Sequence, residues 1–160
     1  MQRKIRFSAG LGAFGSTADR FVQAGYSEPV SLEEMIRRAS QVPGLEAVEL
    51  VEGWHLTEDN LENIMRELKD YGLKVSVVLP DLWATRRWAR GTLTHPDGSV
   101  REAAKQSIKN AMKVARITGC NLVDVWLGQD GWEYCFTQDY AAAWDRTVDA
   151  LRECADFEPE

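Results

Sequence analysis

Residues that could do chemistry gather in the stretch from Leu122 to Tyr134. It begins as an apolar run and ends in two glycines, an amide, two carboxylates and aromatic rings (LVDVWLGQDGWEY). Trp126 and Trp132 could offer flat walls beside the polar side chains of Gln129 and Asp130. This mixture suits a polyhydroxylated ligand, which presents both C–H faces and hydroxyl groups. The same composition also fits a strand-to-helix loop whose tryptophans only cap a core.

Alternating strands and helices must position this stretch. Short apolar runs predict strands over residues 4–8, 47–51, 75–79 and 122–127. Helical periodicity and capping residues predict helices from about Leu32 to Ser40, from a cap at Thr57 to Tyr71, from Ser99 to Gly119, and from Tyr140 to Ala155. The order is therefore βα repeated four times, and no linker divides it.

Capping patterns and one apolar face support these helices. Ser31 to Glu34 and Ser99 to Glu102 both have the capping-box pattern, in which a hydroxyl residue precedes glutamate by three positions. In the last helix, Trp144, Val148 and Leu151 fall on one face, which we expect to be buried.

This alternation predicts an α/β fold with a parallel sheet and right-handed crossovers. An open doubly wound sheet and four units of an eight-unit barrel both satisfy it. The strand-to-helix loops are long, aromatic or polar, whereas the helix-to-strand connections are short. Since a (β/α)8 barrel collects its chemistry on the strand-to-helix side, we expect residues 1–160 to be one domain, the N-terminal half of a TIM barrel.

Composition excludes several functional classes. A net charge of −6 argues against a nucleic-acid binder, because phosphate contacts need clustered cations. No apolar run approaches membrane-spanning length and no secretion signal opens the chain, so we expect a cytoplasmic protein with no membrane partner. Three widely spaced cysteines, Cys120, Cys135 and Cys154, suggest neither a disulfide framework nor a zinc site.

Three segments carry a resemblance to a known family. They are Lys74 to Trp83 (KVSVVLPDLW), the run through Asp97, Val100 and Arg101 into the helix that bears Asn110, and Trp126 to Tyr134 (WLGQDGWEY). In this order they resemble xylose isomerase and the wider xylose isomerase-like superfamily of sugar isomerases and epimerases. The similarity is strongest from Lys74 to Tyr134 and weak before Ala47.

The resemblance implies roles for four residues. His55 and Glu58 match the family's histidine after the second strand, which assists opening of the sugar ring, and the acid three places on that steers it; the family usually has aspartate there. Trp83 and Trp126 match the aromatic walls of the sugar site. Independently, a neutral imidazole can shuttle a hydroxyl proton, and a carboxylate on its other nitrogen would fix the tautomer.

Other polar residues are weaker candidates for substrate contacts. They are Gln129 and Asp130, followed by Glu52, His95 and Asp124. The candidate residues also have ordinary structural explanations. His55 could be a loop histidine without a partner, and Glu58 could be an acid that the helix dipole favours in a first turn.

The resemblance also implies that the intact parent enzyme binds a divalent metal (Mg, Mn or Co) through ligands from the fifth to eighth strands. Within these 160 residues no spacing of His, Asp and Glu makes a metal site, so we expect none bound by this chain alone. The chain would need the missing C-terminal half-barrel, or would self-associate, because an isolated half exposes the edges of its first and fourth strands.

The leading functional hypothesis is therefore the N-terminal half of a metal-dependent aldose–ketose isomerase, inactive alone, whose partner is a monosaccharide. The alternatives are a sugar epimerase of the same superfamily and a non-catalytic sugar-binding or assembly module. A complete flavodoxin-like domain is a third reading.

Overall fold

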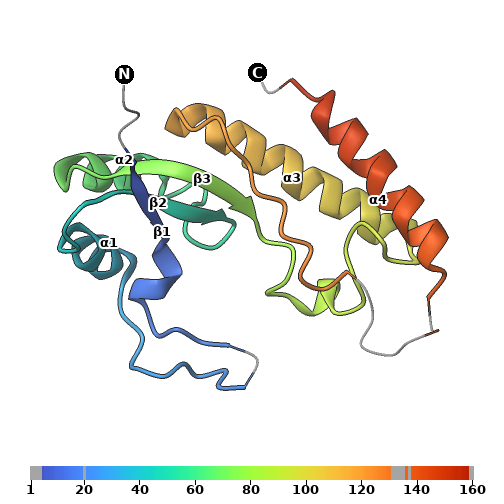
Figure 1. The fold of residues 1–160 in the computed structure, drawn as a ribbon, viewed down its shortest axis with the longest axis horizontal. Helices are drawn as coiled ribbons and strands as arrows, with labels where there is room; N and C mark the ends of the chain where they lie inside the picture. The colour runs from blue at the N-terminus through green and yellow to red at the C-terminus, as the bar shows by residue number, and fades with distance from the viewer. Residues whose placement is uncertain (1–4, 20, 131–135, 137, 159–160) are drawn as a thin grey trace.

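The computed structural model describes residues 5–19, 21–130, 136 and 138–158. Its elements, in chain order, are β1 (Phe7–Gly10), the 3₁₀ helix η1 (Leu11–Phe14), α1 (Leu32–Ser40), β2 (Leu45–Glu52), α2 (Leu61–Asp70), β3 (Lys74–Pro80), the 3₁₀ helix η2 (Arg86–Trp88), α3 (Gly98–Thr118) and α4 (Tyr140–Ala155). Figure 1 shows α1 and α2 beside the sheet, α3 running alongside β3, and α4 beyond it against α3.

Three strands form a parallel sheet in the order β1-β2-β3. Gly10 pairs with Glu49, and Val51 pairs with Leu79, so the carboxyl ends of the strands meet at one edge. Each strand leads there into a loop, as in one part of a (β/α) barrel. The prediction of an α/β fold with parallel strands is confirmed.

The segment predicted as a fourth strand, residues 122–127, forms a single bridge instead. Val78 pairs with Val123: the Val78 N–H donates to the Leu122 carbonyl and the Asp124 N–H donates to the Val78 carbonyl, both at 3.1 Å. Within the described residues no strand pairs with its other edge. With a neighbour on one side only, the segment keeps an extended course without a regular ladder.

Alternation along β2 divides the sheet into two faces. Val48 and Leu50 are fully buried against α1 and α2, where they join the largest apolar cluster. Glu49 and Val51, one position along, line a cavity on the opposite face. Because successive strand residues point to opposite faces, one side of β2 serves the core and the other is available for a ligand.

Two predicted helix starts are wrong by one to three residues. α2 begins at Leu61 because residues 57–60 form a turn in which the Asn60 side chain accepts from the Thr57 N–H at 2.8 Å. α3 begins at Gly98, because Asp97 rather than Ser99 caps it, accepting from the Ser99 N–H at 2.8 Å. The Ser31 cap of α1 is confirmed: its hydroxyl accepts from the Glu34 N–H.

The predicted buried face of α4 is wrong at two of its three residues, and the third, Val148, is half-buried. Trp144 is 71% exposed and Leu151 is 38% exposed, whereas the buried residues are Ala143, Ala150 and Cys154. α4 lies against α3 (Figure 1). Ala150 and Cys154 of α4 share an apolar cluster with Ala104 and Ile108 of α3, and small side chains allow a close approach. No described helix has the length and apolar content needed to cross a membrane.

Candidate functional site

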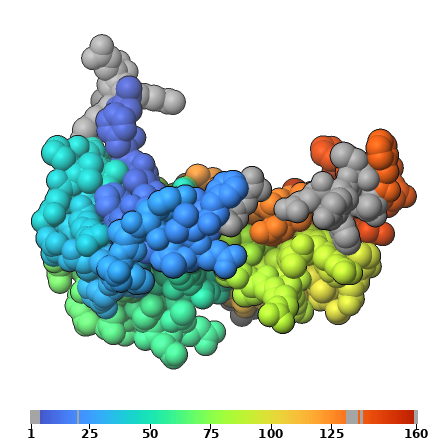
Figure 2. Space-filling view, turned by 90° about the horizontal axis from the view of Figure 1, so that it is seen from below, coloured from blue at the N-terminus to red at the C-terminus, as the bar shows by residue number. Residues whose placement is uncertain are grey.

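A cavity of about 400 Å³ lies at the edge of the sheet where the strands end. It is lined by Gly10, Leu11, Gly12, Ala13, Glu49, Val51, Trp54, His55, Leu79, Trp83, Asp124 and Trp126. The space-filling view shows a hollow between the N-terminal segments and the later part of the chain (Figure 2). His55, Trp83 and Trp126, which come from three different units, are brought together here.

His55 is fixed by the end of its own strand. The backbone N–H of His55 donates to the Val51 carbonyl at 2.8 Å, and the ring nitrogen Nδ1 of His55 accepts from the backbone N–H of Val51 at 3.1 Å. Gly53, with a φ of +83°, makes the tight turn that allows this return. The Asn60 side chain donates to the His55 carbonyl at 3.1 Å, which ties the loop to the start of α2.

His55 lines the cavity, and its second nitrogen, Nε2, lies beside Gly12. Since Nδ1 accepts a backbone hydrogen bond, the neutral ring carries its proton on Nε2. Nε2 is buried and has no hydrogen-bond partner, and a Cβ built on Gly12 would lie 4.0 Å from it. The Trp54 ring stacks on the imidazole, with 4.9 Å between ring centroids and 18° between planes. The site therefore presents a fixed N–H donor.

Burial lowers the pKa of His55 to about 4, so the ring is neutral at neutral pH. A neutral imidazole with Nδ1 engaged and Nε2 protonated donates a hydrogen bond but has no free nitrogen to accept a proton. The role of His55 as a proton shuttle stays a prediction. In this tautomer the neutral ring can donate a hydrogen bond through Nε2.

Glu58 is exposed in the turn before α2, outside the cavity lining. In this structure the Val51 N–H, rather than a carboxylate, bonds to His55 Nδ1. The charge of Glu58 acts on Glu52 instead: burial, then Asp81 and Glu58, raise the pKa of Glu52. A catalytic role for Glu58 stays a prediction.

The two tryptophans form an aromatic corner. The Trp83 and Trp126 rings meet edge to face, with 5.0 Å between centroids and 71° between planes. Asp81 fixes the loop that carries Trp83, because its carboxylate accepts from the Trp83 and Ala84 N–H groups at 3.1 and 2.9 Å. Trp126 remains 53% exposed, which leaves ring surface for a ligand.

Two carboxyl groups complete the polar lining. Glu49 projects from β2 and Asp124 from the segment beside β3. Burial, and then the charge of Asp124, raise the pKa of Glu49. Sequence reasoning missed Glu49 and Trp54. The available signal for Glu49 was an acid at an alternate position of an otherwise apolar strand.

The remaining predicted contacts lie outside this cavity. The Asp130 carboxylate accepts from the Thr92 N–H at 2.9 Å, from the Thr94 N–H at 2.8 Å and from both threonine hydroxyls, so it fastens a loop. Gln129 is exposed and does not line the cavity. His95 accepts from the Asp97 N–H at 3.0 Å in the turn before α3. Trp132 is not among the described residues.

A divalent cation does not fit the residues present. Among those that the structure describes, no three His, Cys, Asp or Glu side chains converge as a metal site. The cavity itself offers only Glu49 and Asp124 as carboxyl groups, and the Nε2 of His55 carries a proton. Hard cations need more oxygen ligands than this.

Several solved structures are similar in fold. An AP endonuclease, family 2, from Brucella melitensis is 22% identical, with a TM-score of 0.62 over 94% of this chain and 50% of that one. A 3-keto-D-glucoside 4-epimerase from E. coli is 18% identical (TM-score 0.59; 78% and 46% covered). A D-psicose 3-epimerase from Clostridium cellulolyticum H10, solved with D-tagatose, is 16% identical (TM-score 0.63; 92% and 47% covered).

These similarities establish the fold, and the chain spans about half the length of each of the three structures. The structure is thus part of a (β/α) barrel. A family model described as xylose isomerase-like TIM barrel matches residues 36–160, which is most of the sequence. The chain belongs to the xylose isomerase-like TIM barrel family.

Proposed function

We propose that this chain forms the sugar-binding wall of an isomerase or epimerase active site, and that residues 1–160 act as one half-barrel unit. One observation carries the proposal: a single cavity combines the aromatic faces of Trp83 and Trp126, the fixed donor of His55 and the acceptors Glu49 and Asp124. Few other ligands need flat apolar walls and both kinds of hydrogen-bonding group at this density.

Each group has a role in binding a sugar. The tryptophan rings would cover the C–H faces, and His55 Nε2–H would donate to the ring oxygen or an adjacent hydroxyl. Glu49 and Asp124 would accept from sugar hydroxyls. Because burial raises the pKa of Glu49, that carboxyl also holds a proton more readily than an exposed one and could donate.

The leading reaction is aldose–ketose isomerisation, and epimerisation is the alternative. Among the solved structures of similar fold are two named sugar epimerases. The divalent cation that the family resemblance implies would need ligands from outside the described residues, either from the rest of a barrel or from a second chain. We therefore expect the 160-residue chain to bind sugar weakly and to be inactive alone.

Isothermal titration with pentoses and hexoses, including D-fructose and D-tagatose, tests the proposal. We expect millimolar binding by the native chain, lost in Trp126→Ala and kept in Trp144→Ala, a matched change of an exposed tryptophan outside the cavity. His55→Phe should weaken binding by about tenfold, because one buried donor is lost. Equal binding by all four proteins would contradict the proposal, and sugar isomerisation by the chain alone would contradict its dependence on further ligands.

A second candidate is a non-catalytic sugar-binding or assembly module. It needs only the aromatic walls and hydrogen-bonding groups that line the cavity. The same titrations with and without Mn²⁺ separate the two: a module binds equally well in both, whereas the active-site proposal expects tighter binding with the cation once the complementary half is added.

A further inference from the structure

The cavity at the edge of the sheet has acidic groups and no cation to balance them. The carboxyl groups of Glu49 and Asp124 line it, and no lysine or arginine of the described part of the chain does so. The imidazole of His55 is the one basic group in this lining, and it is neutral at neutral pH because burial lowers its pKa to about 4. The cavity is therefore suited to a ligand that brings positive charge.

The two carboxyl groups are not neutralised by the protein. Glu34, for comparison, pairs with Arg37 and Arg38 at 2.6 and 2.8 Å. Among the residues that the structure describes, no side-chain hydrogen bond or ion pair reaches Glu49 or Asp124. Burial, and then the charge of Asp124, raise the pKa of Glu49, because the two ionised groups repel each other. A cation between them would relieve this repulsion.

Three indole rings line the same cavity, those of Trp54, Trp83 and Trp126. The face of an indole attracts cations more strongly than that of other aromatic side chains. Outside the cavity the chain satisfies such a face itself, since the Arg87 guanidinium lies 5.4 Å from the centroid of the Trp88 ring. In the described part of the chain no lysine or arginine lies over the three cavity rings. Their faces thus provide a second attraction for a cation.

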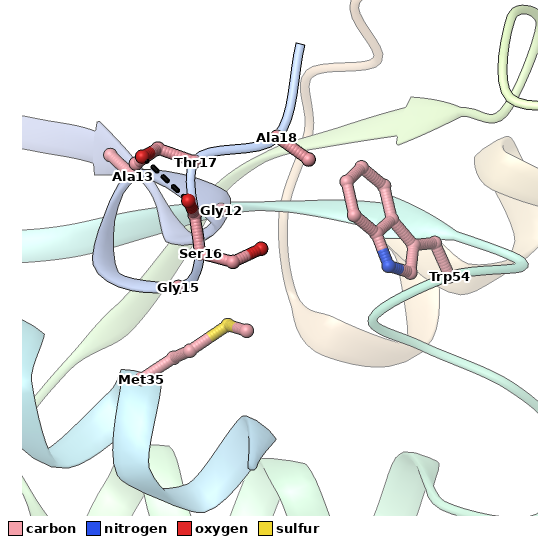
Figure 3. Close-up of a pocket in the computed structure, with 8 residues that line it drawn as sticks. All are labelled: Gly12, Ala13, Gly15, Ser16, Thr17, Ala18, Met35 and Trp54. Carbon is pink, nitrogen blue, oxygen red and sulfur yellow. Dashed lines mark hydrogen bonds between the residues drawn. The ribbon is translucent and has the colours of Figure 1, made fainter. Parts of the chain in front are cut away.

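A neighbouring cavity of about 320 Å³ shows that this chemistry is local. It shares Gly12, Ala13 and Trp54 with the first cavity. Figure 3 shows the side chains of Met35, Ser16 and Trp54 around it. None of its lining residues has an ionisable side chain. The net charge of −6 is therefore not spread evenly over the two cavities, and the acidic pair belongs to the one with three tryptophans.

We propose that the ligand of the first cavity is an amino sugar, whose ammonium group is held by the carboxylates of Glu49 and Asp124 and by the faces of the tryptophan rings. The inference rests on the proposed function and names its substrate class. An ammonium group donates three hydrogen bonds, so both carboxylates can accept from it. A hydroxyl in its place donates one and leaves the charge of the carboxylates unbalanced. The volume of about 400 Å³ lies within the usual range for small-molecule sites.

Calorimetric titration of the native chain with matched sugars tests the proposal. The pairs are D-glucosamine with D-glucose, D-galactosamine with D-galactose, and D-mannosamine with D-mannose, at about pH 6.5, where the amino group is mostly protonated. In each pair a hydroxyl replaces the ammonium group and little else changes. We expect at least one amino sugar to bind about tenfold more tightly than its neutral counterpart. Methylammonium and Mn²⁺, each titrated alone, should bind far more weakly.

Variants of the acidic pair locate the preference. Glu49→Gln with Asp124→Asn removes both charges and keeps both side-chain shapes, and should bring the ratio of amino-sugar to neutral-sugar affinity to about one. Binding of neutral sugars should persist, because amide oxygens still accept from hydroxyls. Glu62→Gln, the same change at an exposed position in the first turn of α2, should keep the native ratio.

The outcomes separate this inference from the proposed function. Equal affinity within all three pairs, or a preference that persists in the double variant, would overturn the amino-sugar proposal while the sugar site stands. Absence of binding by every sugar would overturn both. Methylammonium binding as tightly as the amino sugar, or tight Mn²⁺ binding that the double variant loses, would assign the acidic pair to a simple cation and overturn the proposal.

Discussion

The region around β1, β2 and β3 differs from the fourth unit in how it is held. In the first region, strands pair along their length and Val48 and Leu50 are sealed beneath two helices. In the fourth unit, residues 122–130 join the sheet through one bridge, and α4 leaves Tyr140 and Trp144 more than half exposed.

The difference shows where the proposed site gets its rigidity. His55 sits at the packed end of a strand with a fixed tautomer. The segment that carries Trp126 joins the sheet through one bridge and is fastened to a loop by Asp130, and Trp126 itself contacts Trp83. Local stability follows the density of buried apolar contacts and protected hydrogen bonds. The donor side is thus preorganised, while the aromatic wall is the less tightly held side of the site.

Truncating a leucine in each region should give the largest difference between them, measured as a loss in free energy of unfolding. Leu50→Ala removes a fully buried side chain and should cost about 2–5 kcal/mol in free energy of unfolding. Leu151→Ala, the same change on the exposed side of α4, should cost about 0.5 kcal/mol or less. Urea unfolding followed by circular dichroism measures both, and similar costs would show that the two regions are packed alike.

Asp130 tests the link that holds the fourth unit. Asp130→Ala leaves the N–H groups of Thr92 and Thr94 without an acceptor and should cost about 2–3 kcal/mol. Amide exchange should rise in residues 91–95 and 122–130 before β2. Asp149→Ala removes only an exposed pair with Arg152 and serves as the control, with almost no change expected. Unchanged exchange in Asp130→Ala would contradict this role.

The first region should carry a pH signature from His55. Its pKa is depressed to about 4 in the folded chain and is about 6.5 when unfolded, so between these values the unfolded state binds the extra proton. Stability is therefore full above pH 6.5 and falls on acidification toward pH 4, by at most about 1.4 kcal/mol per pH unit.

Urea unfolding at pH 7, 6 and 5 measures this slope. His55→Gln should flatten it, and His95→Gln, in a turn far along the chain, should not. An identical slope in His55→Gln would show that the buried imidazole is not its source.

The smallest effect on folding is expected at the exposed face of α4. Trp144→Ser should change unfolding free energy by about 0.5 kcal/mol or less, because the ring is 71% exposed. It should nevertheless weaken self-association, which we expect because α4 has exposed aromatic side chains. Sedimentation equilibrium checks both proteins, and a native chain that is monomeric at high concentration would contradict the expectation.

Sequence patterns determined the parts of this protein that depend on neighbours along the chain. Alternation and capping chemistry predicted the parallel strands and the bounds of α1 and α4. Because the strands are parallel, the residues that follow them share one edge of the sheet. The assignment of His55, Trp83 and Trp126 to one site came from the family resemblance, and the shared edge agrees with it.

Only the tertiary structure decided what depends on contacts distant in sequence. It showed that a backbone N–H fixes the His55 tautomer, that Asp130 binds a loop 36 and 38 residues away, and that α4 packs through alanines rather than Trp144. The physical reason is that periodicity defines the faces of an element but not which face a neighbour covers. Hydrogen-bond partners are chosen when the chain folds back on itself, and residue type alone does not identify them.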